Sequence, residues 1–118
     1  MKQDLEQRLI NFSIRVIEIV ERMPKTVPEE SLAKQLGRSS TSVSLNYGEA
    51  QSAESRKDFV HKIKIVLKEL RETHICLRLI KQANLLRTES SMDNLISENN
   101  ELIAIFVKSV ATAQNRGK

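Results

Sequence analysis

The chain has 118 residues, of which 40% are hydrophobic and 29% are charged, and its formal net charge is +4. This composition indicates one globular domain over residues 1–118 and excludes an intrinsically disordered chain. Three glycines and two prolines are too few for the turns of a β-sandwich or barrel, and a single cysteine excludes an intramolecular disulfide and a multi-cysteine zinc site. The single cysteine suits a reducing cytoplasm, and no apolar run is long enough to cross a membrane, so we expect a cytoplasmic protein without a membrane partner.

Residues 4–22 are predicted to form the first helix. Their apolar residues recur at alternating spacings of four and three, which places them on one helix face. This seam consists of Leu5, Leu9, Phe12, Val16, Ile19 and Met23. We expect four more residues to widen the buried stripe: Ile10, Ile14, Ile17 and Val20.

Both prolines of the chain follow this first helix. Pro24 should end it, because the residue before a proline avoids the helical region. Thr26 and Glu29 have the spacing of a capping box, and Pro28 suits the first turn of a helix. The second helix is therefore predicted over residues 27–50.

The second predicted helix contains a run of small hydroxyl residues: Ser39, Ser40, Thr41, Ser42 and Ser44. Serine and threonine are poor helix formers, yet the alternating spacing of the seam continues through the run without a break. That seam consists of Leu32, Leu36, Ser39, Val43, Asn46 and Ala50. We expect the hydroxyl groups to allow close packing and to bond to carbonyl groups of their own helix, rather than to act in catalysis.

Two further helices are predicted over residues 55–86 and 91–114. Ser55 and Asp58 have capping-box spacing at the start of the third. The third seam is Phe59, Ile63, Val66, Leu70, Thr73, Leu77 and Ile80, and the fourth is Met92, Leu95, Asn99, Leu102, Phe106 and Ser109. Four long helices joined by short turns predict an all-α fold, an antiparallel up-down-up-down four-helix bundle.

The residues that commonly carry catalysis are few and scattered. His61 and His74 lie thirteen residues apart on the third predicted helix, a spacing that does not bring two rings to one metal ion. Cys76 is two residues from His74 and so points to another side of the helix, which favours a packed hydrophobe over a nucleophile. The glycines are isolated, so no phosphate-binding loop is present. We predict no enzymatic activity, no cofactor, no metal and no small-molecule substrate.

Charge is distributed unevenly between the last two predicted helices. Residues 56–81 contain eight cations and three anions, whereas residues 89–108 contain four anions and one cation. The basic residues of the third helix fall on a single stripe beside the apolar seam: Lys57, His61, Lys64, Lys68, Arg71 and Arg78. A basic stripe of this kind is typical of phosphate binding, of assembly with an acidic surface, or of a solvated helix face.

Nucleic acid is the partner that this stripe favours, with RNA and DNA both open. The candidate binding residues are Arg38, Arg56, Lys57, Lys64, Lys68, Arg71 and Arg78. Aromatic residues do not alternate with the cations, so stacking on single-stranded bases is not indicated and contact with the backbone is the expectation. The alternative is an interaction scaffold, in which the basic helix docks on the acidic fourth helix of a neighbouring subunit and binds no nucleic acid.

Asn46 and Glu49 form a polar motif in the second predicted helix. Asn46 and Asn99 both fall on seam positions, and a buried asparagine costs stability unless it is hydrogen-bonded, although it can fix helix register. We expect a structural role for this motif, with ligand binding as the alternative.

Residues 12–86 resemble a known family through a series of motifs. These are the proline after the first helix, Leu-Ala-Lys-Gln-Leu-Gly-Arg at 32–38, Ser42-Val43 with Asn46 and Glu49, Ser-Arg-Lys-Asp-Phe at 55–59 and Lys-Glu-Leu-Arg-Glu-Thr at 68–73. The chain is similar to the four-helix-bundle proteins encoded within intervening sequences of bacterial 23S rRNA genes, the S23 ribosomal protein family. It departs from the family at Ala50, where the family usually has glycine, and at residues 68–69, where the family commonly has Gly-Ser.

The resemblance implies a cytoplasmic bundle that assembles as a homopentamer and has a role with nucleic acid. It also implies that Ser42, Asn46 and Glu49 are a feature of the family fold.

Overall fold

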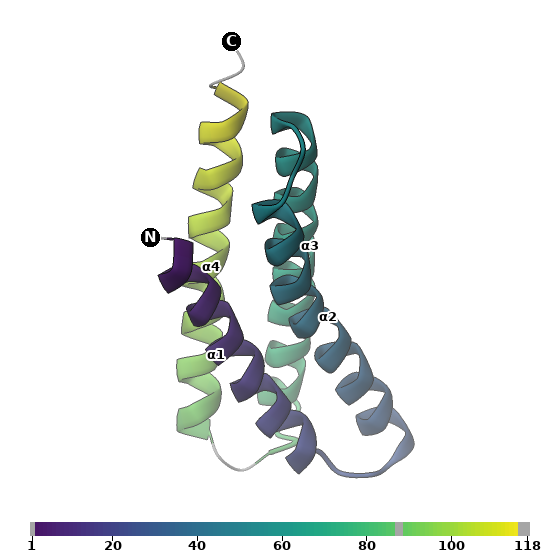
Figure 1. Ribbon diagram of the computed structural model, residues 1–118. Helices are drawn as coiled ribbons and strands as arrows, with labels where there is room; N and C mark the ends of the chain where they lie inside the picture. Colours follow the sequence, from purple (N-terminus) through teal and green to yellow (C-terminus); the bar gives the residue numbers. More distant parts are fainter. Residues whose placement is uncertain (1, 87–88, 116–118) are drawn as a thin grey trace.

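The structure is a computed structural model that describes residues 2–86 and 89–115, and these form four α-helices without a strand. The helices are α1 (Lys2–Arg22), α2 (Val27–Gln51), α3 (Arg56–Gln82) and α4 (Glu89–Asn115). Successive helices run in opposite directions along an elongated body of 49 × 23 × 22 Å (Figure 1). The predicted all-α four-helix bundle is confirmed.

Each helix packs on its neighbours in the chain, and α1 also touches α4 along the most sparsely packed side. The predicted seams supply the core, with Leu5, Leu32 and Phe59 only partly buried at its ends. Three polar seam residues, Ser39, Thr73 and Asn99, are fully buried as predicted. The Asn99 amide nitrogen donates to the Leu70 carbonyl at 3.1 Å, which ties α4 to α3.

The junctions follow the predicted signals in most details. Thr26 is the N-cap of α2 and Pro28 lies in its first turn, but the Thr26 hydroxyl donates to the Glu29 carboxylate and accepts no backbone N–H, so the capping box is incomplete. At α3 the Ser55 hydroxyl accepts from the Asp58 backbone N–H at 3.0 Å, as predicted.

The predicted end of the third helix is wrong, because α3 ends at Gln82 rather than near residue 86. Asn84 has a φ of 55°, and its backbone N–H donates to Lys81. The Leu85 N–H donates to the Ile80 carbonyl at 3.0 Å. Together these bonds form a Schellman motif, in which asparagine takes the left-handed position usually held by glycine. The motif also turns Leu85 back against the core.

The expectation that Ile10, Ile14 and Ile17 widen the buried stripe is also wrong. These side chains are 39%, 49% and 42% exposed, and only Val20 of the predicted set is partly buried. Because α1 packs only sparsely against α4, neighbouring helices cover a smaller part of its circumference than its apolar residues occupy. The three isoleucines and the exposed Leu45 line a shallow hollow of about 350 Å³ between α1 and α2.

The hydroxyl run is helical and packs tightly, as predicted. Ser39 and Ser40 are fully buried, and the hydroxyls of Ser39, Ser40 and Thr41 bond to carbonyl groups one turn earlier in α2. The same run also joins neighbouring helices. The Ser39 hydroxyl lies 2.8 Å from that of Thr73 in α3, and the Ser13 hydroxyl of α1 donates to the Ser40 carbonyl at 3.1 Å.

Candidate nucleic-acid interface

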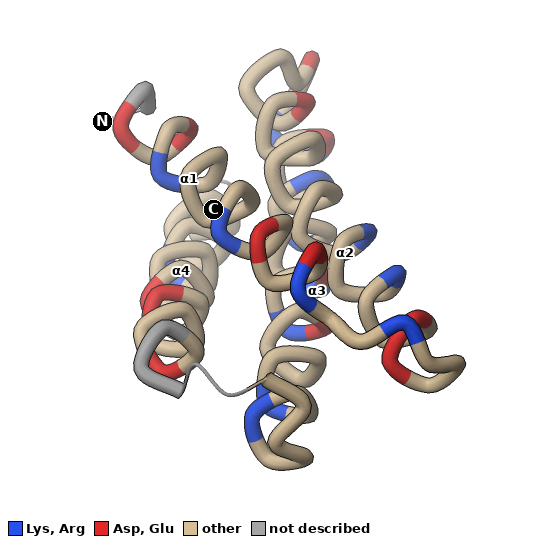
Figure 2. Tube along the Cα trace, turned by 90° about the horizontal axis from the view of Figure 1, so that it is seen from below, with Lys and Arg blue, Asp and Glu red and all other residues tan. Residues whose placement is uncertain are grey.

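Five predicted interface residues form one continuous basic surface on α3, which we call the basic stripe. All five side chains are exposed, and their spacing of three, four or seven residues keeps them on one side of the helix. The stripe consists of Lys57, Lys64, Lys68, Arg71 and Arg78. At 1.5 Å per residue it is about 32 Å long. Figure 2 shows basic residues recurring along α3. The exposed His61 lies within the stripe.

The stripe residues form no ion pair with any residue in the described ranges. Other lysines of α3 are paired: Lys62 with Glu49 at 2.6 Å, and Lys81 with Asp93 at 2.5 Å. Their bonds reach α2 and α4. The positive charge on the outer side of α3 is therefore not neutralised by direct contact within this part of the chain.

Arg56 and Arg38 differ from the stripe residues. Arg56 is the first residue of α3 and is exposed beside the stripe. Arg38 crosses from α2 to α3, where its guanidinium bonds Glu69 through two nitrogens, at 3.2 and 3.3 Å, and also bonds Glu72. The hydrogen bond to Glu69 is the main cause that raises the pKa of Arg38, and the bond from Arg38 lowers the pKa of Glu72. Arg38 thus belongs to a contact between helices.

The polar motif of α2 meets the same contact. Ser42 donates to the Glu69 carboxylate at 3.3 Å, and the Asn46 amide donates to both the carbonyl and the hydroxyl of Ser42 at 2.9 Å. Glu69 is only 7% exposed, so these donors and Arg38 satisfy a buried carboxylate. Glu49 is separate, since it pairs with Lys62.

Asn46 does not lie on the buried seam, which corrects the prediction. Asn46 is half-buried, and the next residue, Tyr47, is buried in its place. A straight helix has 3.6 residues per turn and drifts away from a strict seven-residue repeat. Eleven residues after Leu36, the core-facing position is therefore Tyr47.

The acidic side chains of α4 are bonded within the chain. Arg8 of α1 holds Glu98 through two bonds, at 2.7 and 2.8 Å, and Glu101 at 3.0 Å. The bond to Glu98 is the main cause that raises the pKa of Arg8. Asp93 forms an ion pair with Lys81. The predicted acidic residue Glu89 begins α4, but its side chain lies outside the described part of the structure.

The potentially reactive groups remain apart. Burial lowers the pKa of His74 and raises the pKa of the Cys76 thiol, which disfavours the charged form of each. Within residues 2–86 and 89–115, no three histidine, cysteine or acidic residues are placed to hold a metal ion. In the same ranges no helix is long and apolar enough to span a membrane.

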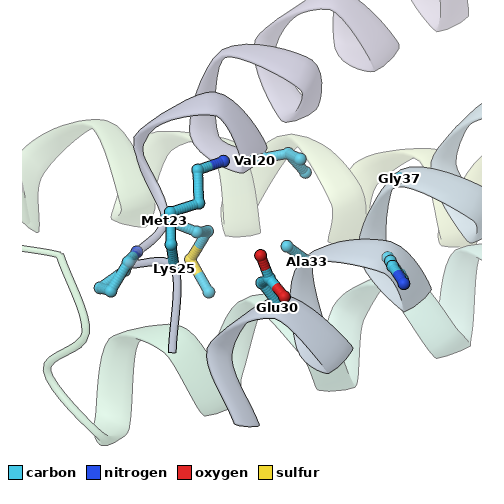
Figure 3. Close-up of a pocket in the computed structure, with 8 residues that line it drawn as sticks. Val20, Met23, Lys25, Glu30, Ala33 and Gly37 are labelled. Carbon is cyan, nitrogen blue, oxygen red and sulfur yellow. The ribbon is translucent and has the colours of Figure 1, made fainter. Parts of the chain in front are cut away.

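A hollow of about 410 Å³ lies where α1 ends and α2 begins (Figure 3). It is lined by Val20, Met23, Pro24, Lys25, Glu30, Ala33, Lys34 and Gly37, none of which belongs to the basic stripe.

One grouping could not be found from the local sequence. Tyr47, Phe59 and Phe106 come from three different helices and line one pocket at the end of the bundle where α3 begins. A search for aromatic residues between the cations of α3 does not detect it, because two of the three rings belong to other helices.

Comparison with known proteins gives a family and a solved structure. The family model described as 23S rRNA-intervening sequence protein matches residues 1–108. A crystal structure of a protein of unknown function from the S23 ribosomal protein family of Bacteroides thetaiotaomicron VPI-5482 is similar, with a TM-score of 0.81 and 27% identity over 89% of this chain and 96% of that chain. No curated protein matches the chain. Neither description assigns an enzymatic activity.

Proposed function

The chain belongs to the 23S rRNA-intervening sequence protein family, and from this premise we propose that it is a non-enzymatic, oligomeric helical bundle of the cytoplasm that binds the nucleic-acid backbone through the basic stripe of α3. One observation carries the proposal. The five cations of the stripe are exposed on one side of α3 and lack ion pairs within the described residues, whereas Arg8, Arg38, Lys62 and Lys81 are all paired.

The stripe suits phosphate groups better than base edges. Lys57, Lys64, Arg71 and Arg78 recur every seven residues, which separates them by about 10 Å along the helix. Lysine and arginine at such intervals contact successive parts of a phosphate backbone and release its counterions. Contacts of this kind hold a strand without reading its sequence.

The scaffold alternative receives less support. The acidic side chains of α4 on which a neighbouring stripe would dock already pair with Arg8 and Lys81, which offsets part of their negative charge. The oligomer itself is supported by the exposed isoleucines of α1 and by Leu45, because contiguous apolar surface favours contact with a partner. The homopentamer remains the proposed assembly, on the family resemblance.

The test is a charge reversal with a matched control. The stripe variant carries Lys64→Glu, Lys68→Glu and Arg71→Glu, and the control carries Lys25→Glu, Lys34→Glu and Lys108→Glu, which are also exposed and without ion pairs in the described part of the chain. Fluorescence anisotropy with labelled RNA and DNA should give at least a 100-fold weaker Kd for the stripe variant, and a change below about 5-fold for the control.

Equal losses for the two variants, or binding that survives in the stripe variant, would contradict the proposal. Light scattering on the same samples separates it from the scaffold alternative. We expect the stripe variant to keep its oligomeric state, and dissociation into subunits would favour the scaffold.

A further inference from the structure

Three of the four aromatic residues of the chain line a single pocket. The chain contains three phenylalanines, one tyrosine and no tryptophan. Tyr47 of α2, Phe59 of α3 and Phe106 of α4 line a pocket of about 470 Å³, and the remaining ring, Phe12, is in the core. This volume lies within the usual range for small-molecule sites.

The rings provide a buried wall and a more accessible one. Tyr47 and Phe106 are almost completely buried and meet edge to face, with ring centroids 5.7 Å apart and planes at 68°. Phe59 is only partly buried, although it lies on the predicted seam. Its ring is therefore the one with surface left for a planar ligand to stack on.

Polar groups lie in the same pocket. Gln51 lines it, and the Oε1 atom of Gln51 is buried without a hydrogen-bond partner among the described residues. That oxygen is closed to solvent, so a ligand N–H reaches it only after the Gln51 side chain turns toward the pocket, and the bond would then satisfy an acceptor whose burial costs free energy. The pocket is also lined by Arg56, whose guanidinium matches the geometry of a phosphate, and by the hydroxyl residues Ser55 and Ser109.

The pocket adjoins the basic stripe. Arg56, which lines the pocket, directly precedes Lys57, the first residue of the stripe, in the first turn of α3. Phe59 lies about 160° around α3 from Lys57, so a strand that leaves the stripe at Lys57 must pass Arg56 and turn around the start of α3 to reach the ring. An aromatic, an amide and an arginine side chain that line one cavity match the base and the phosphate of one nucleotide.

We propose that this pocket holds one unstacked nucleotide, with its base against Phe59 and Gln51 and its phosphate at Arg56. The assignment to a nucleotide within a strand rests on the proposed function, since the stripe supplies that strand. A free nucleoside monophosphate has the same chemistry and is the other source of such a ligand. The pocket thus gives a preference for single strands that the stripe alone does not provide.

The test compares single-stranded RNA, duplex RNA of the same sequence, and AMP, each with the full chain. Phe59→Ala should weaken single-strand binding about 5- to 100-fold and leave duplex binding within about 2-fold. Phe59→Tyr keeps a stacking ring and should retain wild-type affinity. Leu67→Ala, at a similarly half-buried apolar residue of α3 outside the pocket, is the control and should change neither.

Each outcome of this comparison either supports or contradicts the proposed nucleotide site. If Phe59→Ala abolishes AMP binding without an effect on the oligonucleotides, the pocket is a nucleotide site, but its ligand is a free nucleotide and not part of a strand. Three results would contradict the proposed nucleotide site. They are equal losses of affinity for single strand and duplex in Phe59→Ala, a loss of affinity in Phe59→Tyr, or unchanged affinity in Phe59→Ala together with no AMP binding. The stripe variant distinguishes the two proposals, because it should lose single-strand and duplex binding alike.

Arg56 is tested through the phosphate. By titration calorimetry, wild-type protein should bind AMP more tightly than adenosine, by about 10-fold or more. In Arg56→Gln the two affinities should become similar. An unchanged preference for AMP in this variant would contradict the placement of the phosphate.

Discussion

The helices α3 and α4 have the same length, 27 residues, but they use their charges in opposite ways. On α4, Asp93, Glu98 and Glu101 are bonded to Lys81 and Arg8. On α3, the basic stripe has no such partner within the described residues. The comparison separates charges that connect helices from charges that a partner can neutralise, and net charge alone does not separate them.

Substitution of Arg38 should give the largest effect that separates charges connecting helices from charges available to a partner. Arg38→Ala leaves the buried Glu69 carboxylate with Ser42 as its remaining donor, so the free energy of unfolding should fall by about 1–2 kcal/mol. The affinity for RNA should change by less than about 2-fold. Urea unfolding and anisotropy measure the two effects, with Lys34→Ala as an exposed control in α2. A large loss of affinity with unchanged stability would place Arg38 in the interface, as the sequence predicted.

Arg8 sharpens the same comparison on the α1–α4 side. Arg8→Ala should lower the free energy of unfolding by about 1 kcal/mol, because Glu98 is largely buried and loses two bonds. Lys64→Ala should change stability by less than about 0.5 kcal/mol and weaken RNA binding several-fold. If chemical unfolding instead shows lower stability for Lys64→Ala, and binding shows weaker RNA affinity for Arg8→Ala, the stripe is structural and the α4 contacts are not.

The smallest expected effect is a pH dependence. Arg38 lowers the pKa of Glu72 in the folded protein from its ordinary value of 4.5. Such a carboxyl adds stability at pH values above its unfolded pKa, and that contribution is lost as the pH falls through the lower folded pKa. Unfolding free energies measured between pH 6 and pH 3 should therefore fall less steeply for Arg38→Gln than for wild type. Parallel curves would contradict the linkage.

The fold could be predicted from the sequence because each helix has an apolar seam and each junction a local signal. Phe12, Leu70 and Asn99 are buried where the spacing placed them. Of the wrong predictions, one failed because the local signal for a helix end was weak and another because the packing of neighbouring helices determines burial. Asn84 ended α3 in a role that glycine usually fills, and Ile14 was left exposed because no neighbouring helix covers it.

The candidate site was predictable only in part. The stripe follows from spacing within one helix, so its residues share a side of α3 as expected. The pairing of Arg38 with Glu69 and Glu72 joins residues on two helices, and the pocket around Phe59 draws on residues from all four. Such contacts depend on how the helices pack, which the periodicity of one segment does not specify.

The salt dependence of binding tests the central claim most directly. If each subunit engages about four phosphates of duplex DNA, log K should fall with log salt concentration at a slope near −3.6. Lys64→Ala with Lys68→Ala should reduce that slope by about 1.8, since each lost phosphate contact removes about 0.9. A wild-type slope near zero, or a slope that the double variant leaves unchanged, would contradict phosphate binding by the basic stripe.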